Sequence, residues 1–195
     1  MIFQRLSFIA AIILVVCSLF LLVSRNWRQS ILALATLYIG VFWLTALVWP
    51  VGLAIVKLVV GWMAGAVLGA STQYGSFLVQ QPELRSVQMF RLTAGGVVVV
   101  LVFALEPTVA EWIEIDRVVL WGAMILIGMG FLQLGIMTNP FNLFIGLLTL
   151  LAGFETIYAV LESSVLVAGL LAVVNLGLAL TGAYLISLQH GEGTP

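Results

Sequence analysis

The chain has 195 residues, of which 63% are hydrophobic and only 8% are charged, and its mean hydropathy is +1.25. A water-soluble domain carries about 25% charged residues because its surface must be wetted, so the composition predicts an integral membrane protein. The net charge of −1 excludes a strongly basic nucleic-acid-binding surface. With one cysteine and one histidine, the chain cannot by itself ligate an iron–sulfur cluster, a structural zinc ion or a bis-His haem. We therefore expect no cofactor, no metal ion and no catalytic residue.

The amino-terminal half of the chain predicts four membrane spans. The first is the apolar run Phe8–Val23, which we expect to be a span and not a signal peptide, because no small-x-small cleavage site follows it. The apolar run Ile31–Ala70 would form about 60 Å of helix, twice the hydrocarbon thickness, so it must fold back once. The corner is expected at Trp49-Pro50, with the tryptophan in an aromatic belt at the membrane surface. A polar stretch, Ser71–Arg91, then precedes a short fourth span, Leu92–Leu105.

Three further spans follow an acidic loop at residues 106–117. The fifth span is predicted at Val118–Met137, and Asn139-Pro140 is a capped turn that begins the sixth, which ends near Leu161. The seventh is Val165–Leu188. The sequence thus predicts an all-α integral membrane protein, a bundle of about seven transmembrane helices. Its parts are a four-span front part (1–105), the acidic loop (106–117), a three-span unit (118–188) and a disordered tail (189–195).

The charges near the span ends predict an orientation in the membrane. Four arginines collect on one face, namely Arg25, Arg28, Arg85 and Arg91. The other face has two arginines and most of the acids, namely Arg5, Arg117, Glu106, Glu111, Glu114, Asp116 and Glu162. Because basic residues near span ends favour the cytoplasm, we expect the amino terminus outside and the carboxyl terminus in the cytoplasm.

Two ionisable residues fall within predicted spans and away from their ends, Lys57 on the third span and Glu155 on the sixth. A charge in hydrocarbon is costly unless it is paired or hydrated, and such residues therefore suggest a functional site. The third span begins near Val51 and the sixth ends near Leu161 at the same face, so helix rise places both charges about 9 Å below that face. We expect them to pair or to share a hydrated cavity at one level.

Two interpretations of these charges stay open. In the functional one, Glu155 is a proton- or ion-binding carboxylate and Lys57 is the neighbour that tunes it. In the structural one, a buried pair only fixes the packing of two spans, or Lys57 reaches towards the headgroups. Asn175 on the last span and Gln133 on the fifth are uncharged candidates for the same path, or for hydrogen bonds between helices.

Glycines inside the spans predict close helix packing. The third span carries Gly61, Gly65 and Gly69 at a spacing of four residues, a row that lets another helix approach closely. The fifth span carries Gly122, Gly128, Gly130 and Gly135. Rows of small residues are common in helical bundles and indicate packing without indicating a function.

The last three spans resemble a known subunit. The stretch Leu126-Ile127-Gly128-Met129-Gly130-Phe131, the turn Thr138-Asn139-Pro140 and the run from Phe144 to Glu155 resemble the three-helix K subunit of complex I. The whole chain, with Lys57 in Ile55-Val56-Lys57-Leu58 and the loop Ser24-Arg25-Asn26, is similar to the E component of hydrogenase-4 and related energy-converting membrane hydrogenases. One departure is on the last span, where such proteins usually carry a second acid and this chain has Asn175.

The resemblance implies a membrane-arm subunit of a complex-I-related or Mrp-antiporter-like assembly in a bacterial or archaeal plasma membrane. Its partners would be antiporter-like and redox subunits, with lipids around it. Glu155 would be the family's buried carboxylate and would line a proton or sodium path with Lys57. Two alternatives are a structural or assembly subunit of a respiratory or photosynthetic complex that conducts no ion, and a stand-alone small-molecule transporter. The transporter is the least favoured because the sequence shows no repeated halves.

Overall fold

The computed structural model describes residues 2–24, 26–73, 85–113, 115–162 and 164–191, and these form seven α-helices with no strand among them. The helices are α1 (Ile2–Val23), α2 (Trp27–Ala46), α3 (Val51–Gln73), α4 (Arg85–Ala110), α5 (Arg117–Ile136), α6 (Pro140–Leu161) and α7 (Val165–Gly191). Six of them, α2 to α7, are long and apolar enough to cross a membrane. The apolar part of α1, Ser7–Val23, is shorter and packs against α2, α4 and α5. The all-helical membrane bundle that the sequence predicts is therefore confirmed.

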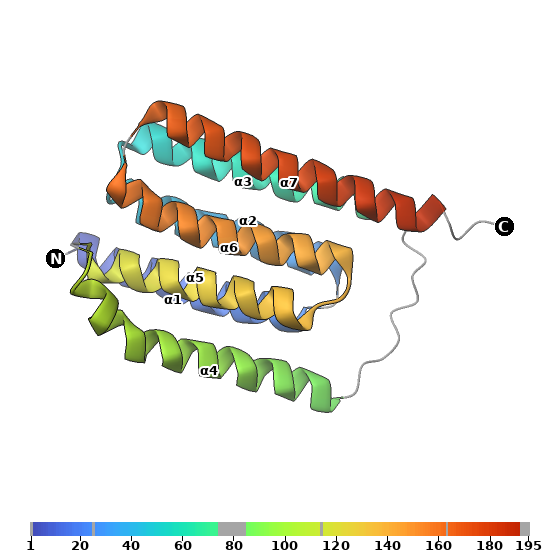
Figure 1. The fold of residues 1–195 in the computed structure, drawn as a ribbon, viewed down its shortest axis with the longest axis horizontal. Coiled ribbons are helices and arrows are strands. Elements are labelled where there is room, and N and C mark those ends of the chain that lie inside the picture. Colours follow the sequence, from blue (N-terminus) through green and yellow to red (C-terminus); the bar gives the residue numbers. More distant parts are fainter. Residues whose placement is uncertain (1, 25, 74–84, 114, 163, 192–195) are drawn as a thin grey trace.

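The helices form two layers, and all the helix axes lie nearly along one direction (Figure 1). Helices α4, α5, α6 and α7 lie side by side in one layer, and α1, α2 and α3 lie behind α5, α6 and α7. The closest pairing in the first layer is α5 with α6, and between the layers it is α3 with α7. Helix α4 has no helix of the second layer directly behind it and contacts only α5 and α1 extensively.

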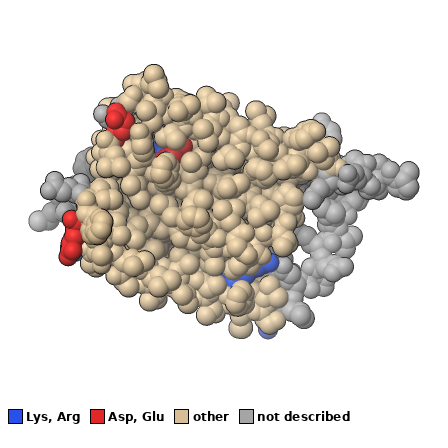
Figure 2. Space-filling model, in the orientation of Figure 1, with Lys and Arg blue, Asp and Glu red and all other residues tan. Residues whose placement is uncertain are grey.

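The two ends of the bundle differ in charge (Figure 2). At the acidic end, α4 is joined to α5 and α6 to α7, and its acids are Glu106, Glu111, Asp116 and Glu162. At the opposite, basic end, α1 is joined to α2, and the arginines are Arg28, Arg85 and Arg91. Arg25 and Glu114, which the sequence also assigns to these two ends, lie outside the described residues.

Local sequence signals set several helix ends. Asn139 is the N-cap of α6, because its side-chain oxygen accepts a hydrogen bond of 3.0 Å from the backbone N–H of Phe141, and Pro140 occupies the first helical position. Asp116 caps α5 in the same way, through the N–H of Val118 at 2.9 Å. The corner between α2 and α3 falls at Pro50, as predicted.

Helix α4 is longer than the predicted fourth span, Leu92–Leu105. Helix α4 has 26 residues, begins at Arg85 and ends at Ala110, and so includes Glu106 and Pro107. Hydropathy marks only the part of a helix in hydrocarbon, whereas the backbone hydrogen bonds continue into the interface, where polar residues are tolerated. The acidic loop is shorter than expected for the same reason. Helix α7 likewise extends to Gly191 into the predicted tail, of which residues 192–195 lie outside the described part of the chain.

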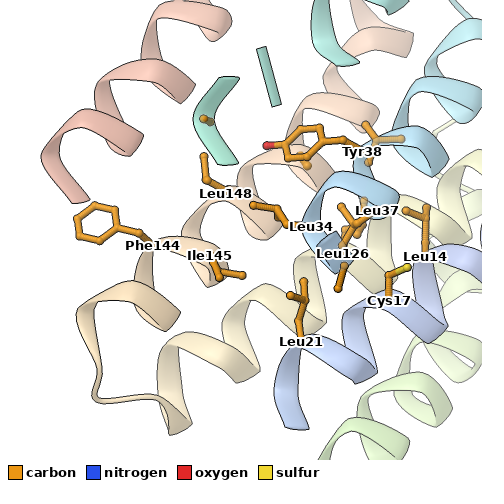
Figure 3. Packing of buried hydrophobic residues seen from close by; sticks show 14 of the residues in the cluster. Leu14, Cys17, Leu21, Leu34, Leu37, Tyr38, Leu126, Phe144, Ile145 and Leu148 are labelled. Atoms are coloured by element: carbon orange, nitrogen blue, oxygen red, sulfur yellow. The ribbon is translucent and has the colours of Figure 1, made fainter. Parts of the chain in front are cut away.

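The core is a cluster of leucines between the two layers. Leu14, Leu34, Leu37 and Leu148 are fully or almost fully buried in it, and Tyr38 lies at its edge (Figure 3). Glycines bring α5 and α6 together at the level of this core. A Cβ atom at Gly130 would lie 2.7 Å from the backbone of Leu150, which is closer than atoms approach one another without a shift.

A matched pair of glycine variants on α5 can test the close contact between α5 and α6. Gly130→Ala should lower the free energy of unfolding by about 1–3 kcal/mol, because the added methyl group meets backbone that cannot rotate away. Gly135→Ala on the same helix meets nothing within 4 Å and should leave stability unchanged or slightly raised, since alanine favours helix over glycine. Unfolding of the purified chain in detergent measures both values. Equal stabilities of the two variants would contradict the close approach.

Candidate functional site

Four polar side chains from four helices meet inside the bundle. They are Tyr38 of α2, Lys57 of α3, Glu155 of α6 and Asn175 of α7, and all four are buried. Because Lys57 is 8% and Glu155 only 2% exposed, neither charge reaches the surrounding membrane or water to any large extent. The sequence predicted Lys57, Glu155 and Asn175 as site residues, and the structure brings these three together.

The two charges form an ion pair. The ammonium nitrogen of Lys57 lies 3.0 Å from the Oε2 atom of Glu155. The other carboxylate oxygen, Oε1, accepts a hydrogen bond of 2.6 Å from the side-chain amide of Asn175. Both oxygens of Glu155 therefore have a partner, each on a different helix, and the carboxylate links α6 to α3 and α7.

Asn175 uses both ends of its amide. Its nitrogen donates to Glu155 and also to the backbone oxygen of Leu171, one turn earlier on α7, at 3.1 Å. Its oxygen accepts a hydrogen bond from the hydroxyl of Tyr38 at 3.4 Å. The network thus extends from the ion pair on α3 and α6 through α7 to α2.

Side-chain direction lets residues at different depths meet. Lys57 and Glu155 are each six residues from the end of their helix at the acidic end, whereas Asn175 is ten residues from the start of α7, about 6 Å deeper. Side chains in a helix lean towards its amino terminus. Asn175 therefore leans towards the acidic end, and Glu155, whose helix runs the opposite way, leans towards Asn175.

Trp49 covers the ion pair on the side of the acidic end. The ammonium group of Lys57 lies 5.6 Å from the centre of the Trp49 ring, within the range of a cation–π interaction. The expectation that Trp49 belongs to an aromatic belt is wrong, because its side chain is turned inward and only 3% exposed. It packs there with Ala159 of α6 and Ala168 of α7. The corner at Pro50 directs it into the bundle.

Tyr38 is the site residue that sequence reasoning missed. Its ring lies against Gly61 of α3, one turn beyond Lys57, and a Cβ atom at Gly61 would overlap the ring carbons. The sequence signal that could have identified Tyr38 was a glycine, Gly61, on the span that follows the span of this aromatic residue. At Gly65, in the same row, a Cβ atom would find ordinary van der Waals distances, so of these two glycines only Gly61 is needed to admit a side chain of the site.

A small cavity adjoins the pair. It lies between α3 and α7, and its polar lining is Lys57, Glu155 and Asn175. It has about 10 Å³ of space for the centre of a water molecule, enough for one. The ammonium group of Lys57 is buried and has no hydrogen-bond partner in the described residues beyond its ion pair.

The structure does not bring Gln133 into this network. Gln133 lies on α5 at 1% exposure, and it faces Gly146 of α6, nine residues or about 13 Å along that helix from Glu155. Neither its amide oxygen nor its amide nitrogen has a hydrogen-bond partner within the described part of the chain. Gln133 is therefore a buried polar residue that lies apart from the site.

The described residues contain no group of three or more His, Cys, Asp or Glu side chains placed to hold a metal ion. The site consists of the Lys57–Glu155 ion pair and two neutral hydrogen-bonding partners, Asn175 and Tyr38. Comparison of the chain with models of protein families, with curated proteins and with solved structures finds no match.

The ion pair makes a testable prediction about stability. Lys57→Met should destabilise the chain by about 3–5 kcal/mol, because it leaves the Glu155 carboxylate buried without its counter-charge. Lys57→Met combined with Glu155→Gln should cost less than Lys57→Met alone, because no charge then stays buried. Arg28→Met, at an exposed position, serves as the control and should have little effect. Unfolding in detergent measures all the variants, and simple additivity of the two single substitutions would show that the charges do not interact.

Proposed function

We propose that this chain is a non-catalytic membrane subunit of a multi-subunit ion-translocating complex, related to complex I, hydrogenase-4 or the Mrp antiporters. In this proposal the Lys57–Glu155 pair is one station of a proton or cation path. The observation that carries the proposal is the pair itself, two opposite charges held 3.0 Å apart in the interior of an apolar helical bundle.

The cost of burying these charges supports a functional role. Removing an ion from water costs several kcal/mol even when a partner is present, and an apolar pair of similar volume often packs as well or better. Ionisable residues within membrane spans commonly mark ion or proton pathways for this reason. The cavity beside Lys57 and Glu155 adds space for a water molecule, which a proton path needs at each gap.

The outer helices support a role within a complex. Only 11% of the most apolar stretch of α4 and 17% of that of α7 is buried within the chain. These two helices form the edges of the four-helix layer (Figure 1), and many of their large apolar side chains are exposed. Neighbouring membrane subunits, antiporter-like or redox-active, would pack on such surfaces together with lipids.

The charge difference between the two ends supports an orientation. Basic residues near span ends favour the cytoplasmic side of a membrane, and the basic end of the bundle carries Arg28, Arg85 and Arg91. We infer that this end faces the cytoplasm of a bacterial or archaeal cell. The amino terminus is then outside, and the Lys57–Glu155 pair lies in the outer half of the membrane.

A structural role is the second candidate, and the hydrogen bonding of the site favours it. Both oxygens of Glu155 are paired, and together with Asn175 and Tyr38 they connect four helices. Such a network can fix the packing of a scaffold subunit without moving any ion. The ion path requires Glu155 to bind and release a proton or a cation, whereas the structural role does not.

Replacing the carboxylate by an amide separates the two functions. Glu155→Gln keeps the shape and the hydrogen bond from Asn175 but removes the titrating group, so ion movement should fall at least about tenfold while the complex still assembles. Glu162→Gln, an exposed acid just beyond the same helix, is the matched control and should behave as wild type. Proton and sodium uptake into vesicles from the native membrane measures the effect. Unchanged ion movement in Glu155→Gln, with normal assembly, would favour the structural role.

Co-purification tests the assignment to a complex. The full chain, tagged and extracted from its native membrane in a mild detergent, should bring with it antiporter-like and redox subunits identified by mass spectrometry. Recovery of the folded chain alone would contradict the proposal and favour a stand-alone transporter.

A further inference from the structure

A second polar site lies at the acidic end of the bundle, between α1, α4 and α5. It is a cavity of about 170 Å³ that is lined mainly by apolar side chains. Phe8 of α1 and Phe103 of α4 are exposed at its rim, and the ring of Phe103 packs at a tilt against that of Trp121 at 4.8 Å. Glu106 and Arg117 provide its charges.

These two charges form an open pair, unlike Lys57 and Glu155. The Nε atom of Arg117 lies 3.8 Å from the Oε1 atom of Glu106, which is too far for a hydrogen bond. The Glu106 side chain is only 13% exposed, and its Oε1 atom has no hydrogen-bond partner within the described chain. Arg117 is 79% exposed, so its guanidinium group is accessible. The cavity thus combines a largely buried acceptor with an accessible cationic donor.

Two further polar groups at this cavity lack a usual partner. Pro107 has no N–H, so the carbonyl oxygen of Phe103 lacks the donor that a helix normally supplies four residues later. The indole N–H of Trp121 is buried and has no acceptor in the described residues. The Phe103 carbonyl oxygen therefore calls for an N–H donor from outside the helix, whereas the Trp121 N–H has almost no accessible surface and is out of a ligand's reach.

We propose that this cavity binds a phospholipid with a zwitterionic, primary-amine headgroup of the phosphatidylethanolamine type. The ammonium group donates hydrogen bonds to Glu106 and to the carbonyl oxygen of Phe103. The phosphate accepts hydrogen bonds from the guanidinium group of Arg117. An acyl chain lies on the exposed rings of Phe8 and Phe103. This site is independent of the proposed ion path and needs only that the chain spans a membrane.

The chemistry of the cavity favours this headgroup over other lipids. A quaternary choline ammonium has no N–H and cannot donate to the Glu106 carboxylate. An anionic glycerol headgroup satisfies Arg117 but brings no positive charge to Glu106. The apolar lining, open at the two phenylalanines, favours a molecule with an acyl chain over a soluble ion.

A lipid series on the full-length chain tests the proposal without any substitution. The chain, purified in detergent and stripped of lipid, is mixed with phosphatidylethanolamine, its mono- and dimethylated forms, phosphatidylcholine or phosphatidylglycerol of identical acyl chains. Native mass spectrometry measures the bound fraction. We expect about tenfold tighter binding of phosphatidylethanolamine than of phosphatidylcholine, with a graded loss on methylation. Equal binding of these two lipids would overturn the proposal.

Two variants then assign the headgroup contacts. Glu106→Gln should abolish the preference for phosphatidylethanolamine over phosphatidylcholine. Arg117→Gln should weaken the binding of phosphatidylethanolamine and of phosphatidylcholine equally, because both lipids carry the phosphate. Glu162→Gln, an acid at the same end but outside the cavity, should leave the preference unchanged. A preference that survives Glu106→Gln would place the lipid elsewhere on the chain, and gel filtration of each variant confirms that it is folded.

Discussion

A buried charge in a membrane protein constrains every element around it, and in this chain the constraint is the pairing of Lys57 with Glu155. Neither charge is stable in an apolar bundle without the other, so α3 and α6 must place them at one depth. They do so because Lys57 is six residues after the start of α3 and Glu155 six residues before the end of α6, at the same end of the bundle. The corner at Pro50 and the connection at Glu162 set these positions.

The packing around the pair follows from the same requirement. The second oxygen of Glu155 needs a donor, which α7 supplies through Asn175, and the amide oxygen of Asn175 needs one in turn, which Tyr38 supplies. Tyr38 reaches this position only because Gly61 has no side chain. In a polar network of this kind, small residues on the neighbouring helices make room for the polar side chains, because each polar group must reach its partner at hydrogen-bond distance.

Two ion pairs among the described residues illustrate how depth decides geometry. The charged groups of Lys57 and Glu155 lie 3.0 Å apart inside the bundle, where no headgroup or bulk water competes for them. Glu106 and Arg117 lie at the acidic end and stay 3.8 Å apart beside a larger cavity that opens outward. We propose the closed pair for the relay of a charge and the open pair for the binding of an amphiphilic ligand.

The sequence by itself determined the membrane character, the seven helices, the capped turn at Asn139-Pro140 and the equal depth of Lys57 and Glu155, because hydropathy, capping chemistry and helix rise are local properties. It misplaced the ends of α4, since hydropathy reports the hydrocarbon and not the helix. Only the tertiary structure decided which side chains meet. Tyr38 joins the site, Trp49 turns inward and Gln133 lies apart, because the rotation of each helix about its axis depends on packing against several neighbours at once.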